Sequence, residues 1–150
     1  MVGLSLALLL AQQKRWRIIV LESRPLETGA EYSPSFDARS TALSWSSRKI
    51  FQAIDIWPEI ERHAAAIGQI HVSDRGHIGQ TRIDAREAGV EALGYVVENS
   101  CLGSVLLHTA ADSDIQLCGA TKVTDIKPLA ESMQLSVENQ QQTDSTVTQI

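Results

Sequence analysis

The segment that decides the fold is Arg17-Ile-Ile-Val-Leu-Glu22, a short β-branched run that closes on an acidic residue. Such a run is typical of a parallel strand covered on both faces. An apolar stretch, residues 1–11, precedes it and has the spacing of a helix. We expect this helix to be buried nearly all round, through its leucines (Leu4, Leu6, Leu8, Leu9 and Leu10). A helix followed by such a strand indicates the second half of a βαβ unit.

The spacing between Gly3 and Glu22 has a specific meaning in dinucleotide-binding folds. There, an acidic residue at the end of the second strand accepts hydrogen bonds from ribose hydroxyls, about 20 residues after a glycine-rich turn. Glu22 follows Gly3 by 19 positions. Gly3 is then a candidate for the third glycine of that turn, small because the helix packs closely on the strand. The residues equally allow an ordinary buried helix and strand, with Glu22 at a solvated strand end.

The apolar N-terminus has a second interpretation, the core of a secretory signal. A signal carries its positive charge before the apolar run and a small-residue cleavage site after it. Here Lys14, Arg15 and Arg17 come afterwards, with Trp16 among them. The stretch is also well short of the ~20 apolar residues that span a membrane. A helix of a folded domain is therefore favoured.

Composition and charge narrow the class of protein. The 150 residues, 43% apolar and 21% charged, suit a single globular domain. The net charge of −5 leaves no basic surface for a phosphate backbone, so we expect no nucleic-acid partner. Cys101 and Cys118 form no CxxC pair. They indicate buried, reduced thiols in an intracellular protein.

The middle of the chain alternates between helical and strand patterns. A turn-rich loop covers residues 24–37. Helical spacing then runs from Arg39 to the break at Trp57-Pro58, and a shorter helix is expected over residues 59–67. Residues 68–74 and 80–84 alternate at period two and predict a hairpin.

A strand over residues 94–98 then leads into a helix over residues 99–111, with Asn99 available as its N-cap. The last third is rich in strand patterns. Residues 114–118 form one such run, and the runs 121–126, 133–137 and 146–150 are spaced like a meander, with a polar turn over residues 140–144. A helix at the first residue and a strand at the last predict a domain cut at both ends. The expected fold class is α/β: a partial Rossmann-like domain over residues 1–150, lacking its first strand, with a β-rich segment.

Four stretches carry a family resemblance: Met1-Val-Gly3, Ile18-Ile-Val-Leu-Glu22, Phe36-Asp-Ala-Arg-Ser-Thr-Ala-Leu43, and His71-Val-Ser-Asp-Arg-Gly-His77 with Leu93-Gly-Tyr-Val-Val-Glu-Asn99. With them the chain resembles the FAD-dependent aromatic hydroxylases of the para-hydroxybenzoate hydroxylase type. The last stretch is most similar to the hydroxylases of ubiquinone biosynthesis. The resemblance covers about residues 1–138 and corresponds to the N-terminal part of such an enzyme.

The resemblance implies four cofactor-binding residues. Gly3 belongs to the glycine-rich turn, and Glu22 is the ribose-binding acid. Arg39, in an Asp-x-Arg motif, resembles the arginine that reaches the flavin cofactor, and its planar fork suits a pyrophosphate or a flavin edge. Asn99 stands where relatives place an Arg or Gln against the cofactor. A surface arginine and a plain N-cap are the alternatives for these last two.

The implied reaction uses NAD(P)H and O₂ to hydroxylate a polyprenylated methoxyphenol on FAD. It implies a cytoplasmic protein, peripheral to the inner membrane, whose partners are the polyprenyl phenol, other ubiquinone-biosynthesis proteins and the membrane surface. No residue of this chain receives a catalytic role, because the flavin carries the chemistry. His71 and His77 lack a third ligand, so we expect no metal site.

Other functions remain open from the sequence alone. One is a different flavin hydroxylase or an NAD-binding protein. Another is a non-catalytic truncated gene product or small interaction module with a Rossmann-like core. A secreted β-rich protein, cleaved near Ala11, ranks last.

The first prediction concerns the purified 150-residue chain. With Gly3 but no earlier glycine of the turn, it should lack the main pyrophosphate anchor and hold no stoichiometric FAD. Absorbance spectroscopy of the purified protein checks this. A yellow protein with about one flavin per chain would contradict it.

Overall fold

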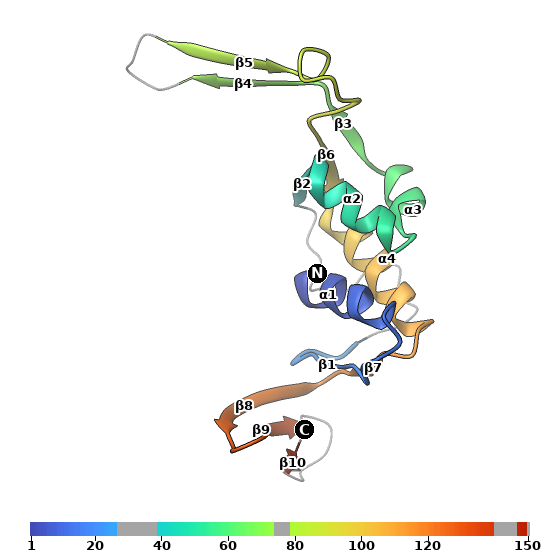
Figure 1. Cartoon of the computed structure of the whole chain (residues 1–150), viewed down its shortest axis with the longest axis vertical. Coiled ribbons are helices and arrows are strands. Elements are labelled where there is room, and N and C mark those ends of the chain that lie inside the picture. The colour runs from blue at the N-terminus through green and yellow to red at the C-terminus, as the bar shows by residue number, and fades with distance from the viewer. Residues whose placement is uncertain (27–38, 74–78, 140–146, 150) are drawn as a thin grey trace. The chain divides into compact units, whose positions relative to one another are not determined.

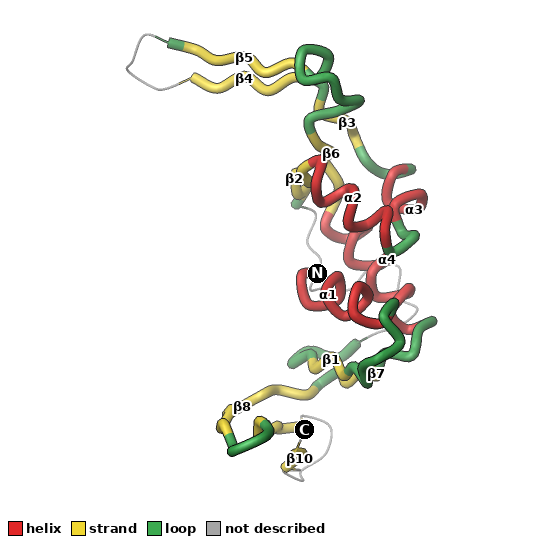
Figure 2. Tube along the Cα trace, in the orientation of Figure 1, coloured by secondary structure: helices red, strands yellow, loops and turns green. Residues whose placement is uncertain are grey.

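The structure is a computed structural model that describes residues 1–26, 39–73, 79–139 and 147–149, in which helices are interspersed among runs of consecutive strands (Figures 1 and 2). Two compact units can be separated. One contains the described residues between 34 and 106. The other contains those of 2–33 and 107–150, so that the division falls inside one helix. The fold class is mixed α/β, as the sequence predicted.

Helix α1 (Val2–Ala11) and strand β1 (Ile19–Leu21) confirm the predicted helix and strand at the N-terminus. The helix packs on the strand. Strand β1 pairs in parallel with β7 (Gln116–Cys118), from Ile19 opposite Gln116 to Leu21 opposite Cys118. The sequence pattern places residues 114–118 in the β-rich last third. In the structure, the strand β7 in this run is the parallel partner of β1. A helix comes directly before β7, but other strands and helices also lie between β1 and β7 in the chain, so this pair is not a simple βαβ unit.

The expectation that α1 is buried nearly all round is wrong. Within this helix Ala7 and Leu8 are buried, whereas Leu6 and Leu10 are exposed. One side of the helix packs and the other does not. The helix stops when Lys14 adopts a left-handed conformation, with φ of 49°, and its amide donates to the carbonyl of Ala11 at 3.0 Å.

The second unit is built on strand β6 (Gly94–Glu98), which is flanked by β2 (Ser40–Ser44) and β3 (Ala65–Ile67), both antiparallel to it. The predicted helix from Arg39 is therefore wrong over residues 40–44. Pairing with β6 supplies hydrogen bonds that outweigh the local helical pattern. At Gly94 the strands come so close that a Cβ would overlap the carbonyl oxygen of Leu43, so this position requires glycine.

Helices α2 (Trp45–Ala53) and α3 (Trp57–Glu61) follow β2. Ser44 caps α2, because its Oγ accepts a hydrogen bond from the amide of Ser47 at 3.2 Å. Pro58 lies in the first turn of α3, where a missing N–H is tolerated, so the predicted break is a helix start. The predicted helix over 59–67 is correct only to Glu61, because residues 65–67 form β3.

The predicted hairpin and the helix after β6 are confirmed. Strands β4 (Gln69–Ser73) and β5 (Gln80–Asp84) pair antiparallel, and the amide of Ala85 donates to the carbonyl of Gly68 at 2.9 Å at their base. Helix α4 spans Asn99–Ala111, the bounds that the sequence predicted.

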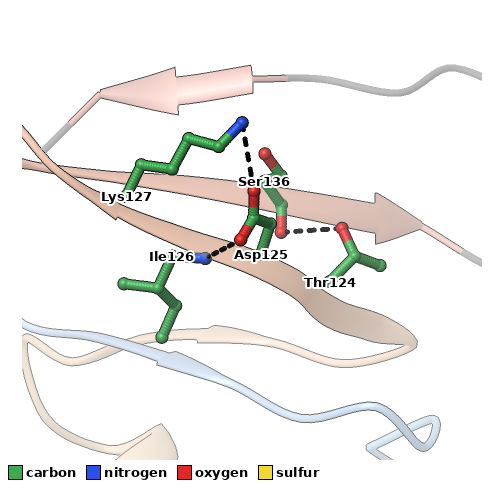
Figure 3. A network of polar contacts seen from close by, with 5 residues as sticks. All are labelled: Thr124, Asp125, Ile126, Lys127 and Ser136. Atoms are coloured by element: carbon green, nitrogen blue, oxygen red, sulfur yellow. Dashed lines mark hydrogen bonds and ion pairs between the residues drawn. The ribbon is translucent and has the colours of Figure 1, made fainter.

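The predicted meander is also confirmed. Strands β8 (Thr121–Pro128), β9 (Met133–Asn139) and β10 (Val147–Gln149) form an antiparallel sheet in the order β10-β9-β8. A register shift between Val123 and Asp125 leaves Thr124 as a bulge, whose hydroxyl donates to the carbonyl of Ser136 at 3.2 Å (Figure 3). Asp125 accepts from the amide of Ile126 at 2.9 Å and pairs with Lys127 at 3.2 Å. The predicted turn over 140–144 lies outside the described residues.

The unit that is built on strand β6 is called the β6 unit. Its core contains a cluster of aromatic rings around one cation. The rings of Trp57 and Tyr95 meet edge to face at 4.7 Å, and Trp45 stacks on Tyr95 at 6.5 Å. The guanidinium carbon of Arg48 lies 4.6 Å from the centre of the Trp45 ring and 5.5 Å from that of Trp57. Within the described residues the Tyr95 hydroxyl, the Trp57 indole nitrogen and Arg48 Nε are buried without a hydrogen-bond partner.

The fold prediction concerns Tyr95. Tyr95→Phe should raise the free energy of unfolding at neutral pH by about 1 kcal/mol, because it removes a buried, unpartnered hydroxyl and keeps the ring. Burial raises the pKa of Tyr95; Glu91 and Glu61 add to the rise and Arg48 opposes it.

Because the folded state raises the pKa of the phenol, it favours the neutral form. The contribution of Tyr95 to the free energy of unfolding is therefore complete below about pH 10 and is lost as the pH rises further. The wild-type chain should therefore lose stability above pH 10 more steeply than the phenylalanine variant. Urea unfolding at neutral and alkaline pH measures both effects. A variant less stable than the wild type at neutral pH would refute the prediction.

Candidate functional site

Glu22 lies directly after the carboxyl end of the parallel strand β1. Its amide donates to the carbonyl of Cys118 at 2.9 Å, and its carbonyl accepts from the amide of Thr121 at 2.8 Å. Its Oε1 accepts from the Ser23 hydroxyl at 3.1 Å and from the Arg24 amide at 3.0 Å. Within the described chain no hydrogen bond ends on Oε2. The half-buried carboxylate is thus held in place through Oε1.

The chain after Glu22 is held by the turn between β7 and β8. The Ala120 amide donates to the carbonyl of Arg24 at 2.9 Å. A Cβ at Gly119 would come within 2.7 Å of the amide nitrogen of Leu26, so a larger residue would displace the Glu22 segment. Ala120 has φ of 52°, in the left-handed region. Nothing in the sequence had singled out Gly119, although a glycine directly after a strand is a recognisable signal.

Gly3 lies in the first turn of α1 and is exposed. A Cβ placed on it would meet no atom within 4 Å. We expected the helix to pack so closely on the strand that this position requires glycine. The described part of the chain shows no such close packing at Gly3. The first turn of α1 carries no acidic residue, so no carboxylate within the turn offsets the positive end of the helix dipole.

The structure brings Arg39 and Asn99 together. The amide of Asn99 donates to the carbonyl of Arg39 at 2.9 Å, one step beyond the last β2–β6 pair, Ser40 with Glu98. The Asn99 Oδ1 accepts from the Thr41 hydroxyl at 2.5 Å. Asn99 is the first residue of α4 and is half-buried, whereas Arg39 is exposed. The predicted residues thus fall into two pairs: Gly3 and Glu22 in one unit, Arg39 and Asn99 in the other.

The histidines and cysteines form no further site in the part of the chain that is described. His71 Nε2 lies 2.9 Å from Gln80 Oε1 across the hairpin, and His77 lies outside the described residues. Three or more metal-ligating side chains do not gather anywhere in the described ranges. Cys101 and Cys118 are unpaired and half-buried rather than fully buried. Burial raises the pKa of the Cys101 thiol, with Glu98 and Glu59 adding to the rise, so its thiolate fraction at neutral pH is small.

The chain is similar in fold to several proteins of known structure. No protein-family model matches the chain. Among solved structures, p-nitrophenol 4-monooxygenase PnpA from Pseudomonas putida matches with a TM-score of 0.73 and 18% identity, over 99% of this chain and 36% of that one. The flavin-dependent monooxygenase PieE, solved with FAD and substrate, matches with a TM-score of 0.73 and 12% identity, over 98% of this chain and 27% of that one.

A third match is aklavinone-11 hydroxylase, solved with FAD and aklavinone, with a TM-score of 0.67 and 16% identity, over 98% of this chain and 29% of that one. The chain has the fold of part of a flavin-dependent monooxygenase. It spans about a third of the length of these proteins. The fold class is thus a partial Rossmann-like FAD-binding fold with a β-rich segment. Across the ranges that are described, no helix has the length and apolar character needed to cross a membrane.

The site prediction concerns the Thr41–Asn99 bond. Thr41→Val keeps the shape of the side chain but removes the hydroxyl, which leaves the half-buried Asn99 Oδ1 without this donor. We expect a loss of about 1–2 kcal/mol in the free energy of unfolding. Thr41→Ser, which retains the hydroxyl, is the matched control and should lose less. Denaturant unfolding of the three proteins is the measurement, and equal stability of the valine variant and the wild type would refute the role of the bond.

Proposed function

We propose that this chain is the nucleotide-binding portion of an FAD-dependent aromatic monooxygenase. The observation that carries the proposal is the position of Glu22, directly after a parallel strand that is preceded by a helix. The fold likeness to PieE and aklavinone-11 hydroxylase, both solved with FAD, supports it. When bound, the flavin would supply the redox chemistry that takes electrons from NAD(P)H and activates O₂.

The residues around Glu22 suit the adenosine part of the cofactor. A ribose presents hydroxyl donors, and the Glu22 Oε2 is an acceptor with no hydrogen bond in the described chain. The start of α1, beside Gly3, suits the negative pyrophosphate, because the positive end of the helix dipole lies there and the first turn itself carries no acidic residue.

The residues at the start of α4 suit the flavin part. Because the Thr41 hydroxyl occupies the Asn99 Oδ1, the amide nitrogen of Asn99 is oriented as a donor. The guanidinium of Arg39 presents a planar fork of donors that matches a pyrophosphate or a flavin edge. A main-chain hydrogen bond joins Asn99 to Arg39, so the backbones of the two residues are held next to each other.

We further propose that the substrate is a polyprenylated methoxyphenol of ubiquinone biosynthesis, as for 2-octaprenyl-6-methoxyphenol hydroxylase. The support is the resemblance of the runs His71–His77 and Leu93–Asn99 to that class. Other ubiquinone-biosynthesis proteins and the membrane surface are the partners that such a substrate implies.

The test uses a complete protein that contains this chain. Glu22→Gln should weaken FAD binding by about 10-fold to 100-fold, because a charge-assisted hydrogen bond to the ribose contributes about 1.5–3 kcal/mol. Flavin fluorescence during titration measures the affinity. Glu131→Gln, an exposed carboxylate between β8 and β9, is the matched control and should leave the affinity unchanged.

Two outcomes would overturn the proposal in distinguishable ways. Equal FAD affinity of Glu22→Gln and the wild type would remove the assigned role of Glu22, and a complete protein that binds no FAD would favour a non-catalytic module. The substrate is tested separately, by oxidation of NAD(P)H stimulated by a polyprenylated methoxyphenol. Stimulation by other phenols but not by this one would reject the substrate class and leave the flavin chemistry intact.

A further inference from the structure

One side-chain hydrogen bond joins two segments that lie far apart in the sequence. The hydroxyl of Thr41, in β2, donates to Oδ1 of Asn99, the first residue of α4, at 2.5 Å. The two residues are 58 positions apart in the chain, and both are half-buried. This bond therefore ties the start of α4 to β2.

The hydroxyl of Thr41 lies on the packed face of β2. Side chains alternate between the two faces of a strand, so Thr41 shares a face with Leu43, which is buried. Val97, its partner in the ladder with β6, is buried as well. A hydroxyl beside apolar side chains costs free energy unless it is hydrogen-bonded, and a valine of the same shape would avoid that cost. The bond with Asn99 gives a physical reason for a threonine at this position.

The main chain of Asn99 is held by other bonds. Its amide donates to the carbonyl of Arg39 at 2.9 Å, and Glu98 before it pairs with Ser40 in the β2–β6 ladder. The Thr41 hydroxyl adds a constraint on the side-chain torsions of Asn99. The effect of this bond therefore falls on the direction of the Asn99 amide group and not on the path of the backbone.

We propose that Thr41 is a positioning residue, whose hydroxyl holds the Asn99 amide group in one orientation before the cofactor binds. With Oδ1 bonded to Thr41, the Nδ2 end of the amide is the end that donates to an acceptor of the cofactor, such as a carbonyl or phosphate oxygen. Thr41 itself acts only through Asn99. The inference rests on the proposed function, which assigns the start of α4 to the flavin part of FAD.

The size of the expected effect follows from side-chain entropy. An asparagine that is already fixed loses less rotational freedom on binding a ligand than one that is free to turn. Fixing one such side chain in advance strengthens binding by about threefold to tenfold. Loss of the Thr41 hydroxyl should therefore weaken FAD binding by about this factor, and only while Asn99 is present.

A double-mutant cycle in a complete protein that contains this chain tests the proposal, with flavin fluorescence during titration as the measure of FAD affinity. Thr41→Val should weaken binding by about threefold to tenfold, and Asn99→Ala by about tenfold. The double variant Thr41→Val/Asn99→Ala should bind FAD no more weakly than Asn99→Ala alone, because Thr41 acts through Asn99. Thr41→Ser keeps the hydroxyl and should retain most of the wild-type affinity.

Two further variants separate the orientation of Asn99 from general stability. Asn99→Asp keeps an oxygen acceptor for Thr41 but replaces the Nδ2 donor with a second oxygen, so it should weaken FAD binding by about tenfold or more. Thr124→Val, the matched control, removes a strand threonine hydroxyl that bonds to the carbonyl of Ser136, and it should leave the affinity unchanged. The visible circular dichroism of the bound flavin should change in Thr41→Val and not in Thr124→Val. Far-ultraviolet circular dichroism confirms that each variant is folded.

Four results would overturn the inference. These are wild-type FAD affinity of Thr41→Val, the same loss from Thr41→Val with and without Asn99, failure of Thr41→Ser to retain affinity, and wild-type affinity of Asn99→Asp. If Glu22→Gln weakens FAD binding in the same protein, any of these results rejects the role of Thr41 and leaves the FAD-binding function intact. A complete protein that binds no FAD would reject the proposed function and this inference together.

Discussion

The main-chain ladder between β2 and β6 is the constraint on which the β6 unit depends. It places Leu43 opposite Tyr95 and brings the two strands so close at Gly94 that no side chain fits there. Trp45 begins α2 directly after β2, so its ring meets Tyr95 within the same packed cluster. One step beyond the other end of the ladder, the carbonyl of Arg39 accepts from the amide of Asn99. The aromatic core and the second pair of candidate residues are thus consequences of one strand pairing.

The unit that contains β1 depends on the parallel pairing of β1 with β7, which positions a candidate residue in the same way. Strand β1 lies parallel to β7, and its carboxyl end delivers Glu22 to the turn at Gly119 and Ala120. There, three main-chain hydrogen bonds between Glu22–Arg24 and Cys118–Thr121 fix the backbone, while the side chain binds its own following residues. A candidate acid is therefore held by local bonds on a rigid strand end. Binding residues are commonly placed in this way, on short loops carried by a regular scaffold.

The sequence predicted best where local pattern and tertiary pairing agree. Helix α4 and the hairpin β4–β5 have strong local periodicity, and both were correct. Residues 40–44 and 65–67 contain small and apolar residues that also fit a helix, and their strand pairing with β6 comes from positions far away in the sequence. No local signal contains that information. The partner of β1 was missed for the same reason.

The candidate site residues show the same difference between local sequence signals and contacts that only the folded chain creates. Glu22 was found because an acidic residue at a strand end is a local signal with a known spacing. The resemblance implied a cofactor role for Arg39 and for Asn99 separately, and the β2–β6 ladder brings the two residues together. Gly119 and Thr41 were missed, since their importance lies in contacts with Leu26 and Asn99 that only the folded chain creates.

The sequence distance spanned by each pairing also has a consequence for folding kinetics. The hairpin β4–β5 and the pair β8–β9 join neighbouring segments, and such pairs form within about 1–10 μs. The β2–β6 ladder joins Ser40 to Glu98, and β1–β7 joins Ile19 to Gln116. Closing such long loops costs chain entropy before any contact compensates for it, and parallel pairing is slower still. The two pairings that carry the candidate residues are therefore expected to form last, after the local hairpins have already folded.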